Sequence, residues 1–400
     1  MRVLIATSPG LGHTFASVPL GWALRAAGHE VLLATAGRLD GDLPAVLGAG
    51  IQVVEVASRD RMEQVRADLR ARRQHEADRL GVSLAEMTAR DVDASRQARY
   101  VLDGNGWAHA VRIFGPMSAA MLDGLVHVAT TWRPDLVVFE SMQGGGPLVA
   151  AMVGVPAVEH PIGFARGPQV VDGLVEHLTH DYARFGVSGP PQDMIALDVS
   201  PPSMGVGPAY GWTMRYVPFN GGGLVTDWLT RPTGRSRIAV TLGSILSELG
   251  HGPFGAIVDA AAEIDADFLL TTGHDDLVAR GPVPDNVRGC GYVPLGALLR
   301  SCDAVVHHGG SSTTLTALDT GLPQLVLPKL ADQFINADAV ARRGCGIVVD
   351  DGAVTAKALG ELIGDDALRV AAAEVRTEMS GLPTPADIAA RLGAHVAAGH

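Results

Sequence analysis

The feature that most constrains the fold of this chain is an alternation of strand-like apolar runs with helical segments, which occurs twice along the sequence. Such alternation is typical of a parallel sheet that is covered by helices on both faces. The strands expected in the first half are residues 3–7, 31–35, 51–56, 136–139 and 155–158, and those in the second half are residues 238–241, 268–270, 304–307, 324–327 and 347–349. Between the first two strands, residues 15–27 have the periodicity of an amphipathic helix that Gly28 ends.

A length of 400 residues exceeds what one hydrophobic core usually supports, so two domains are expected. The domains predicted are residues 1–216 and residues 236–380. Dense glycine and proline mark residues 217–235 as the linker, and residues 381–400 are expected to form a helix that packs back on the first domain. Because open parallel sheets bind ligands beyond the carboxyl ends of their strands, the chemistry should lie in a cleft between the two sheets.

The composition excludes several classes of function. With 31 basic and 43 acidic residues the formal charge is −12, and no basic stripe suggests a nucleic-acid partner. Cys290, Cys302 and Cys345 are too few and too scattered for a disulfide framework or a metal cluster. The first apolar run is too short for a signal peptide, and no apolar stretch reaches the length that spans a membrane. We therefore expect a cytoplasmic protein without a membrane or nucleic-acid partner.

The strongest functional signal lies at residues 305–323, which begin Val-Val-His-His-Gly-Gly-Ser-Ser-Thr-Thr. A strand ends at the histidines, two glycines let the backbone approach a ligand, and hydroxyl residues cap a new helix. The free N–H groups at that helix start form an anion site, and a histidine beside it adds a donor to a phosphate oxygen. Taken alone, the same pattern also describes a strand–turn–helix junction with no ligand.

Asp332 and Gln333 follow the next expected strand. A carboxylate next to an amide can hold the vicinal hydroxyl groups of a sugar. The alternative is that Asp332 is only the N-cap of a helix.

A second candidate site follows the first strand, where Ser8-Pro-Gly-Leu-Gly ends in His13. A dinucleotide loop is not indicated, because its third glycine is missing and no acid ends the second strand. A single histidine in this position is usually structural. A histidine that acts as a base needs its other ring nitrogen oriented by a carboxylate.

Together these motifs make the chain recognisable. The histidine–glycine segment, followed by Gly321-Leu-Pro323, Pro328, Asp332-Gln333 and Asn336-Ala337, resembles the donor signature of GT-B glycosyltransferases of natural-product pathways. The resemblance covers nearly the whole chain and is nearest to the enzymes that glycosylate macrolide and enediyne antibiotics, the calicheamicin glycosyltransferases above all. It implies two Rossmann-like domains facing a cleft, with the acceptor bound by residues 1–216 and the nucleotide sugar bound by residues 236–380.

The resemblance also implies which residues hold the donor. His308, Gly310 and the amides that follow would surround the diphosphate, Asp332 and Gln333 would hold the sugar, and Tyr292 would stack on the pyrimidine in place of the more common tryptophan. The alternative for Tyr292 is an ordinary core aromatic. The complete expected donor site is Gly243, Ser244, Tyr292, Val293, His308, Gly310, Ser311, Ser312, Thr313, Asp332 and Gln333.

For catalysis, the resemblance implies that His13 deprotonates the acceptor hydroxyl group. Relatives orient this histidine with an aspartate at the end of a strand, where this chain has Glu140. Asp135 is an unsuitable substitute, because it opens the same strand and would lie about 16 Å from the other end.

The reaction implied is an inverting, metal-independent transfer of a deoxysugar from thymidine diphosphate, less readily from uridine diphosphate, to an aglycone hydroxyl group. No cofactor is expected, and the partners are the sugar donor and the aglycone. A homodimer is possible. Residues 58–115 and 160–185 should shape the acceptor pocket. The alternatives are a non-catalytic auxiliary protein with the same fold and a nucleotide-sugar 2-epimerase.

Overall fold

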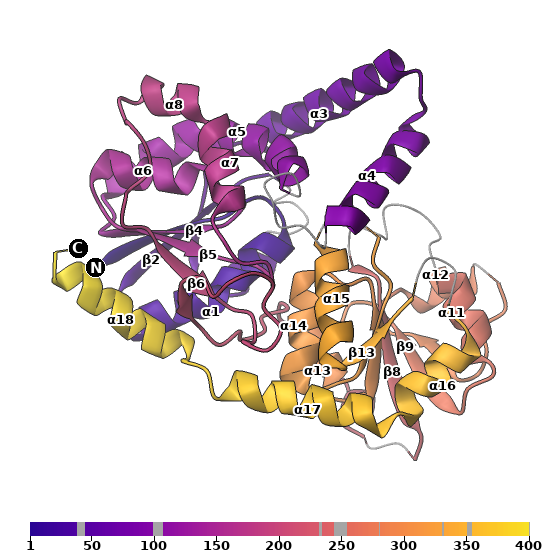
Figure 1. Cartoon of the computed structure of the whole chain (residues 1–400). Helices are drawn as coiled ribbons and strands as arrows, with labels where there is room; N and C mark the ends of the chain where they lie inside the picture. Colours follow the sequence, from indigo (N-terminus) through magenta and orange to yellow (C-terminus); the bar gives the residue numbers. More distant parts are fainter. Residues whose placement is uncertain are drawn as a thin grey trace.

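The computed structural model of the chain describes residues 1–37, 45–98, 107–231, 234–243, 254–279, 281–329, 332–349 and 354–399. It contains two parallel sheets, one in each half of the chain, which lie on opposite sides of the molecule (Figure 1). The first sheet is formed by β1 (Arg2–Ala6), β2 (Glu30–Thr35), β3 (Gln52–Glu55), β4 (Leu136–Glu140), β5 (Ala157–His160), β6 (Ile195–Asp198) and β7 (Trp212–Thr213). The second is formed by β8 (Ser236–Thr241), β9 (Ala266–Leu270), β10 (Val287–Gly289), β11 (Ala304–His307), β12 (Gln324–Val326) and β13 (Gly346–Val348).

Both sheets have the strand order of a doubly wound fold. The first runs β3-β2-β1-β4-β5-β6-β7 and the second β10-β9-β8-β11-β12-β13. In each, the order reverses between two adjacent strands, β1 and β4 in the first sheet and β8 and β11 in the second. Ligands of such sheets bind at this point, beyond the carboxyl ends of the strands. The expected α/β class with two Rossmann-like sheets is confirmed.

Helices cover both faces of each sheet (Figure 1). The hydrophobic cores consist of strand residues that alternate between the two faces, such as Leu4 and Ile5 of β1, packed against the apolar sides of the helices. The helices of the first half are α1 (Leu11–Ala26), α3 (Arg59–Leu80), α4 (Leu84–Ala98), α5 (Ala108–Trp132), α6 (Gly145–Val153), α7 (Gln169–His177) and α8 (Thr179–Arg184). Those that follow are α9 (Asp227–Thr230), α11 (Phe254–Ala261), α12 (His274–Val278), α13 (Leu295–Leu299), α14 (Ser311–Thr320), α15 (Gln333–Arg343), α16 (Ala356–Gly364), α17 (Asp366–Ser380) and α18 (Pro385–Ala397).

The last helix returns to the first half of the molecule. In Figure 1, α17 runs along the second sheet and α18 lies beside α1. The guanidinium group of Arg391 lies 3.5 Å from the centre of the Trp212 ring. A capping box formed by Thr384 and Asp387 starts α18. The Thr384 hydroxyl group accepts a hydrogen bond from the amide of Asp387, and the Asp387 carboxylate accepts one from the amide of Thr384. The C-terminal helix therefore connects the two halves by packing as well as by the chain.

Three of the observed strands are missing from the sequence-based expectations. They are β6, β7 and β10, of which β7 has two residues and β10 has three. Runs as short as β7 and β10 carry too little periodicity to be distinguished from turns. The first helix also begins earlier than expected, at Leu11, because Gly10 serves as its N-cap. This places His13 in the first turn of α1.

Among the residues that the structure describes, α5 is long and apolar enough to cross a membrane. The expectation that no stretch reaches this length is wrong by that measure. The helix nevertheless packs within the protein against α6 and α7. Its residues Met121, Leu122 and Leu125 are fully buried in the core of the first half.

Candidate active site

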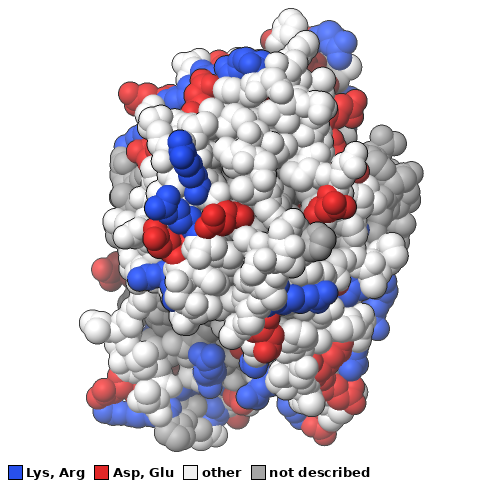
Figure 2. Space-filling view, turned by 90° about the vertical axis from the view of Figure 1, so that its left-hand side faces the viewer, with Lys and Arg blue, Asp and Glu red and all other residues white. Residues whose placement is uncertain are grey.

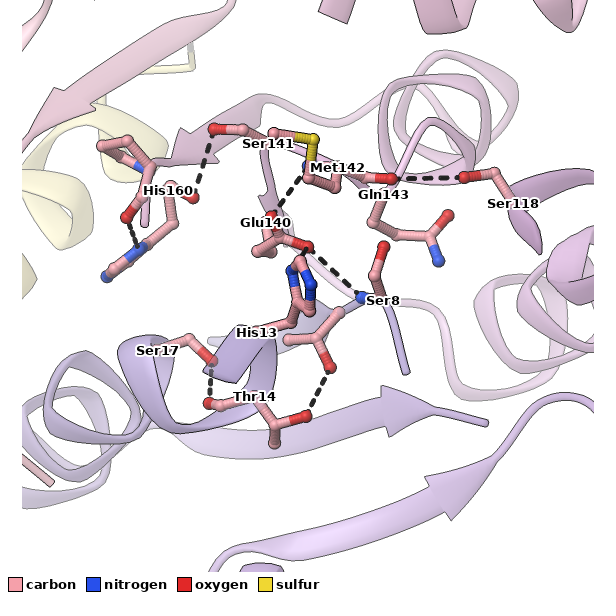
Figure 3. Close-up of polar contacts among 12 residues, drawn as sticks. Ser8, His13, Thr14, Ser17, Ser118, Glu140, Ser141, Met142, Gln143 and His160 are labelled. Atoms are coloured by element: carbon pink, nitrogen blue, oxygen red, sulfur yellow. Dashed lines mark hydrogen bonds and ion pairs between the residues drawn. The ribbon is translucent and has the colours of Figure 1, made fainter. Parts of the chain in front are cut away.

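His13 and Glu140 meet at the carboxyl ends of two neighbouring strands (Figure 3). Glu140 is the last residue of β4, and His13 lies in the turn of helix that follows β1. Nδ1 of His13 lies 3.2 Å from Oε2 of Glu140. The glutamate side chain is fully buried, while the histidine side chain is one-fifth exposed. The pair therefore presents one ring edge to the carboxylate and remains accessible from solvent.

The Glu140 carboxylate is fixed by the backbone around it. Its Oε1 accepts a hydrogen bond of 2.8 Å from the amide of Met142, and its Oε2 accepts one of 3.4 Å from the amide of Ser8. Asp135 has no part in this arrangement, because it precedes β4 and its carboxylate accepts a hydrogen bond from the amide of Arg2. Two backbone amides thus hold the Glu140 carboxylate at the end of β4, beside His13.

The surroundings of His13 change its basicity. Burial lowers the pKa of His13, but the charge and hydrogen bond of Glu140, with the charge of Asp332, raise it by more. The net result is a pKa above the ordinary value of 6.5. The ring also packs edge-on against Phe114 of α5, with the ring centres 5.0 Å apart. A base of raised pKa beside an aromatic surface can deprotonate a bound hydroxyl group.

The two adjacent histidines of β11 have different environments. His307 is fully buried, with its Nε2 2.8 Å from Oε1 of Gln324, and its Nδ1 accepts a hydrogen bond from the amide of Gly309. Burial lowers the pKa of His307 to about 3, so the ring is neutral and structural. His308 follows the strand, and burial lowers its pKa as well, although the charge of Asp332 opposes this. His308 therefore lies close to Asp332 as a neutral ring.

The helix that follows these histidines has no side-chain cap. Its N-cap is Gly310, which forms no capping hydrogen bond. The expectation that hydroxyl residues cap this helix is wrong, because those side chains are used otherwise: Ser311 Oγ donates to Asp332, and Thr314 Oγ1 donates to the carbonyl of Gly310. The first amides of α14, at Ser311, Ser312 and Thr313, are therefore left for an anion.

Asp332 is not a capping residue either. It stands at the start of α15, but its side chain forms no capping hydrogen bond. Its Oδ2 accepts hydrogen bonds of 2.6 Å from Ser311 Oγ and 3.1 Å from Asn336 Nδ2. Asn336 is 1 % exposed and also donates to the carbonyl of Gly309. Asn336 therefore orients Asp332, a role that its position one helical turn later could have indicated.

Gln333 lies next to Asp332, on the first residue of α15. It is buried, and its Oε1 accepts a hydrogen bond of 2.9 Å from the amide of Lys329. The side chain is thereby held across the turn that joins β12 to α15.

Tyr292 lies on the surface and not in the core. Its side chain is 68 % exposed, which rules out the alternative of a core aromatic. Its hydroxyl group donates a hydrogen bond of 2.9 Å to the carbonyl of Asn220. The next residue, Val293, packs against an apolar cluster that includes Leu298 and Leu299 of α13. The tyrosine ring therefore offers an open aromatic face.

Gly243 lies close to His308. It has a φ of +72°, and a Cβ atom there would lie 2.6 Å from Cε1 of the histidine. Only glycine fits this approach. Ser244, the other expected residue of this loop, lies outside the described residues.

The two halves of the site face each other across a narrow gap. A Cβ atom on Gly163, in the loop after β5, would overlap the hydroxyl group of Ser311 and would lie 3.8 Å from Oδ2 of Asp332. The same Asp332 is close enough to His13 for its charge to raise the histidine's pKa. The structure thus brings the His13–Glu140 pair, the start of α14 and Asp332 close together.

Residues 58–115 and 160–185, expected around the acceptor, form α3, α4, the start of α5, and α7 with α8; residues 99–106 are outside the described part. In Figure 1, α3 and α4 extend from the first half as an arm, and α4 returns toward the second half. There the guanidinium group of Arg96 lies 5.5 Å from the ring centre of Phe334 on α15. This arm therefore contacts both halves of the protein.

Charged side chains are mixed on the surface. On the face shown in Figure 2, basic and acidic groups are interspersed, and the described residues gather into no basic stripe there. Within the described part of the chain, no group of three His, Cys, Asp or Glu side chains is placed to hold a metal ion.

Comparison with known proteins identifies the family. The family described as erythromycin biosynthesis protein CIII-like matches through its N-terminal domain at residues 22–243 and its C-terminal domain at residues 255–395. The elloramycin glycosyltransferase ElmGT of Streptomyces olivaceus is 37% identical over 398 residues, which cover 98% of this chain and 97% of that protein.

Solved structures agree. The glycosyltransferase SnogD of Streptomyces nogalater superposes with a TM-score of 0.79 at 39% identity, covering 99% of both chains. The glycosyltransferase SsfS6 of Streptomyces sp. SF2575, in complex with thymidine diphosphate, superposes with a TM-score of 0.78 at 29% identity, covering 98% of this chain and 99% of that one. A particular closeness to the calicheamicin glycosyltransferases stays a prediction. The chain belongs to the erythromycin biosynthesis protein CIII-like family and is a glycosyltransferase of antibiotic-biosynthesis type with the two-domain GT-B fold.

Proposed function

We propose that this glycosyltransferase moves a deoxysugar from a thymidine diphosphate sugar to a hydroxyl group of a polyketide aglycone, with inversion at the anomeric carbon. An enediyne is one such aglycone, and a uridine diphosphate sugar is the less favoured donor. The observation that carries the proposal is the His13–Glu140 pair, which lies near enough to Asp332, at the uncapped start of α14, for the charge of Asp332 to raise the pKa of His13. The thymidine diphosphate bound by SsfS6, a relative of the same fold, supports the choice of nucleotide.

His13 serves as the base in this proposal. Its Nδ1 is 3.2 Å from Glu140, so the neutral ring carries its proton on Nδ1 and leaves Nε2 to accept one. As the acceptor oxygen attacks the anomeric carbon, its proton passes to Nε2, and the Glu140 carboxylate stabilises the resulting imidazolium. The attack from the side opposite the leaving diphosphate inverts the configuration.

The leaving diphosphate takes up the electron pair of the broken bond between the anomeric carbon and its oxygen. The first amides of α14 and the neutral ring of His308 can donate hydrogen bonds to this developing charge. Asp332, held by Ser311 and Asn336, would accept hydrogen bonds from the sugar hydroxyl groups together with Gln333. These donors provide the electrostatic stabilisation that a divalent cation supplies in other phosphate sites, so neither a metal nor a cofactor is part of the proposal.

The first half of the chain would bind the acceptor. Phe114 packs against the His13 ring, and Met117 and Met142 add apolar surface in the same half. Aromatic and methionine side chains of this kind suit a large apolar aglycone better than a second sugar.

The test is an assay of nucleoside diphosphate release from a thymidine diphosphate deoxysugar, with and without a polyketide acceptor. The proposal predicts release that depends on the acceptor, and a product whose anomeric configuration, read by NMR coupling constants, is opposite to that of the donor. Release that is equal without acceptor would instead indicate an epimerase or hydrolase. No binding of the donor at all would indicate a non-catalytic auxiliary protein. A product with retained configuration would contradict the single displacement.

A further inference from the structure

Two adjacent residues of the linker between the sheets face different halves of the protein. The ring of Phe219 packs edge-on against Phe15 and Trp22 of α1, with ring centres 4.7 Å and 5.1 Å apart. The side chain of the next residue, Asn220, instead contacts residues of the second half. The linker is thus seated on both halves at one point and is not a free tether.

Asn220 forms hydrogen bonds with three separate segments around the donor site. Its Oδ1 accepts a bond of 3.0 Å from the amide of Gly296, and its Nδ2 donates one of 3.4 Å to Thr316 of α14. Its backbone carbonyl accepts the bond from the Tyr292 hydroxyl group. Since α13 starts after Pro294 with no side-chain cap of its own, Asn220 satisfies an amide in the first turn of that helix from a distance.

The Tyr292 ring has little else to fix its position. A side chain that is 68 % exposed is weakly constrained by packing, so the bond from its hydroxyl group to Asn220 sets where the ring lies. The linker approaches this hydroxyl group closely, because Gly221 has a φ of +79° and a Cβ atom there would overlap it. The segment that would carry the pyrimidine is therefore positioned by the linker.

We propose that Asn220 is a positioning residue for the donor nucleoside. It holds Tyr292 and the first turn of α13 in the arrangement that receives the base, and Phe219 ties this arrangement to α1 of the acceptor half. The inference rests on the proposed donor site, in which Tyr292 stacks on the pyrimidine. It predicts that the loss of Asn220 weakens recognition of the nucleoside and leaves recognition of the diphosphate at α14 intact.

The experiment compares binding of thymidine diphosphate and of inorganic pyrophosphate to the full chain by calorimetry. Asn220→Ala should weaken thymidine diphosphate roughly tenfold, as expected for the loss of one or two hydrogen bonds that hold the site, and should leave pyrophosphate unchanged. Asn220→Asp keeps an oxygen for the amide of Gly296 and should restore most of the affinity. Leu224→Ala, in an exposed position of the same linker, is the matched control and should bind both ligands as the wild type does.

Tyr292→Phe tests the other contact of this residue, the bond to the backbone carbonyl of Asn220, which Asn220→Ala leaves in place. It does not alter the linker, so it remains informative if Asn220→Ala fails to fold. It keeps the ring and removes the hydroxyl group, so thymidine diphosphate should again weaken, about three- to tenfold, with pyrophosphate unchanged. If wild-type protein binds thymidine diphosphate and both variants bind it equally well, Asn220 does not position the site. An equal loss of pyrophosphate affinity would also overturn the inference, since it would mean general damage. If wild-type protein binds pyrophosphate but not thymidine diphosphate, the proposed donor is wrong and the inference fails with it.

Discussion

Oε2 of Glu140 lies 3.2 Å from Nδ1 of His13, and the same carboxylate is held by the amides of Met142 and Ser8. All three of these groups can donate a hydrogen bond, and a carboxylate can accept from each of them, whereas an amide at this position has only one acceptor oxygen. These bonds therefore fix the Glu140 carboxylate beside the histidine ring. Substitutions of Glu140 and of His13 can therefore test the carboxylate and the base separately.

Glu140→Gln should lower kcat/KM about ten- to a hundredfold, because it removes the charge that stabilises the imidazolium but keeps one acceptor oxygen. Glu140→Ala should cost more than Glu140→Gln and less than the loss of His13 itself. Asp135→Asn, at the other end of β4, is the control and should retain wild-type turnover. The measurements are steady-state kinetics, with the affinity for thymidine diphosphate determined in parallel. Equal turnover of Glu140→Gln and wild type would show that the carboxylate does not assist the base.

The pH dependence of kcat/KM should have an acidic limb above pH 6.5. A base must be neutral to accept a proton, so activity falls as the pH drops below the pKa of His13. Burial lowers that pKa, while Glu140 and Asp332 raise it by more, so the net shift is upward. Removing the Glu140 charge leaves burial to act, and the limb of Glu140→Gln should move to lower pH. A wild-type limb below pH 6.5, or one that stays in place in the variant, would contradict this assignment.

Thymidine diphosphate should raise the melting temperature by a few degrees, because a ligand that binds only the folded state stabilises it by about 2.7 kcal/mol at a hundred times Kd. Uridine diphosphate should give a smaller shift. His308→Ala should lose most of the effect, whereas His75→Ala, an exposed histidine of α3, should keep it. Differential scanning fluorimetry measures all of these. If millimolar concentrations of both nucleotides leave the wild-type transition unmoved, the phosphate site at α14 is wrongly placed.

Turnover should be unaffected by a chelator. In the proposed mechanism the amides at the start of α14 and the His308 ring would provide the donors that the diphosphate needs. The measurement is product formation after dialysis against EDTA, followed by addition of Mg²⁺ or Mn²⁺. Activity that disappears with EDTA and returns with either ion would show that the leaving group needs a cation.

The fold could be predicted from the sequence because its buried strands form continuous apolar runs between helical segments. Because the pattern occurs twice, it also indicated one parallel sheet in each half of the chain. Strands β7 and β10 could not be predicted, since two or three residues at the edge of a sheet are stabilised by their neighbours and not by their own composition.

For the site, the sequence indicated which residues follow strands, but not which of them contact one another. His307 and His308 are adjacent and identical in type, and only their surroundings distinguish the fully buried, structural ring of His307 from the partly buried ring of His308. Asn220 gives no local signal, because its partners Tyr292 and Gly296 lie 72 and 76 residues away in the sequence. Contacts of this kind depend on how the linker crosses the second half.

The most direct test of the account is the turnover of His13→Ala, measured together with its affinity for thymidine diphosphate. If His13 is the base, turnover with the natural acceptor should fall roughly 10²–10⁴-fold. Nucleotide affinity should hardly change, since the residues proposed to hold the nucleotide lie in the second half of the chain. Near-normal turnover would show that the base lies elsewhere or that the acceptor needs none. Loss of nucleotide binding would show that His13 belongs to the donor site, which would contradict the proposed mechanism while the fold and family stand.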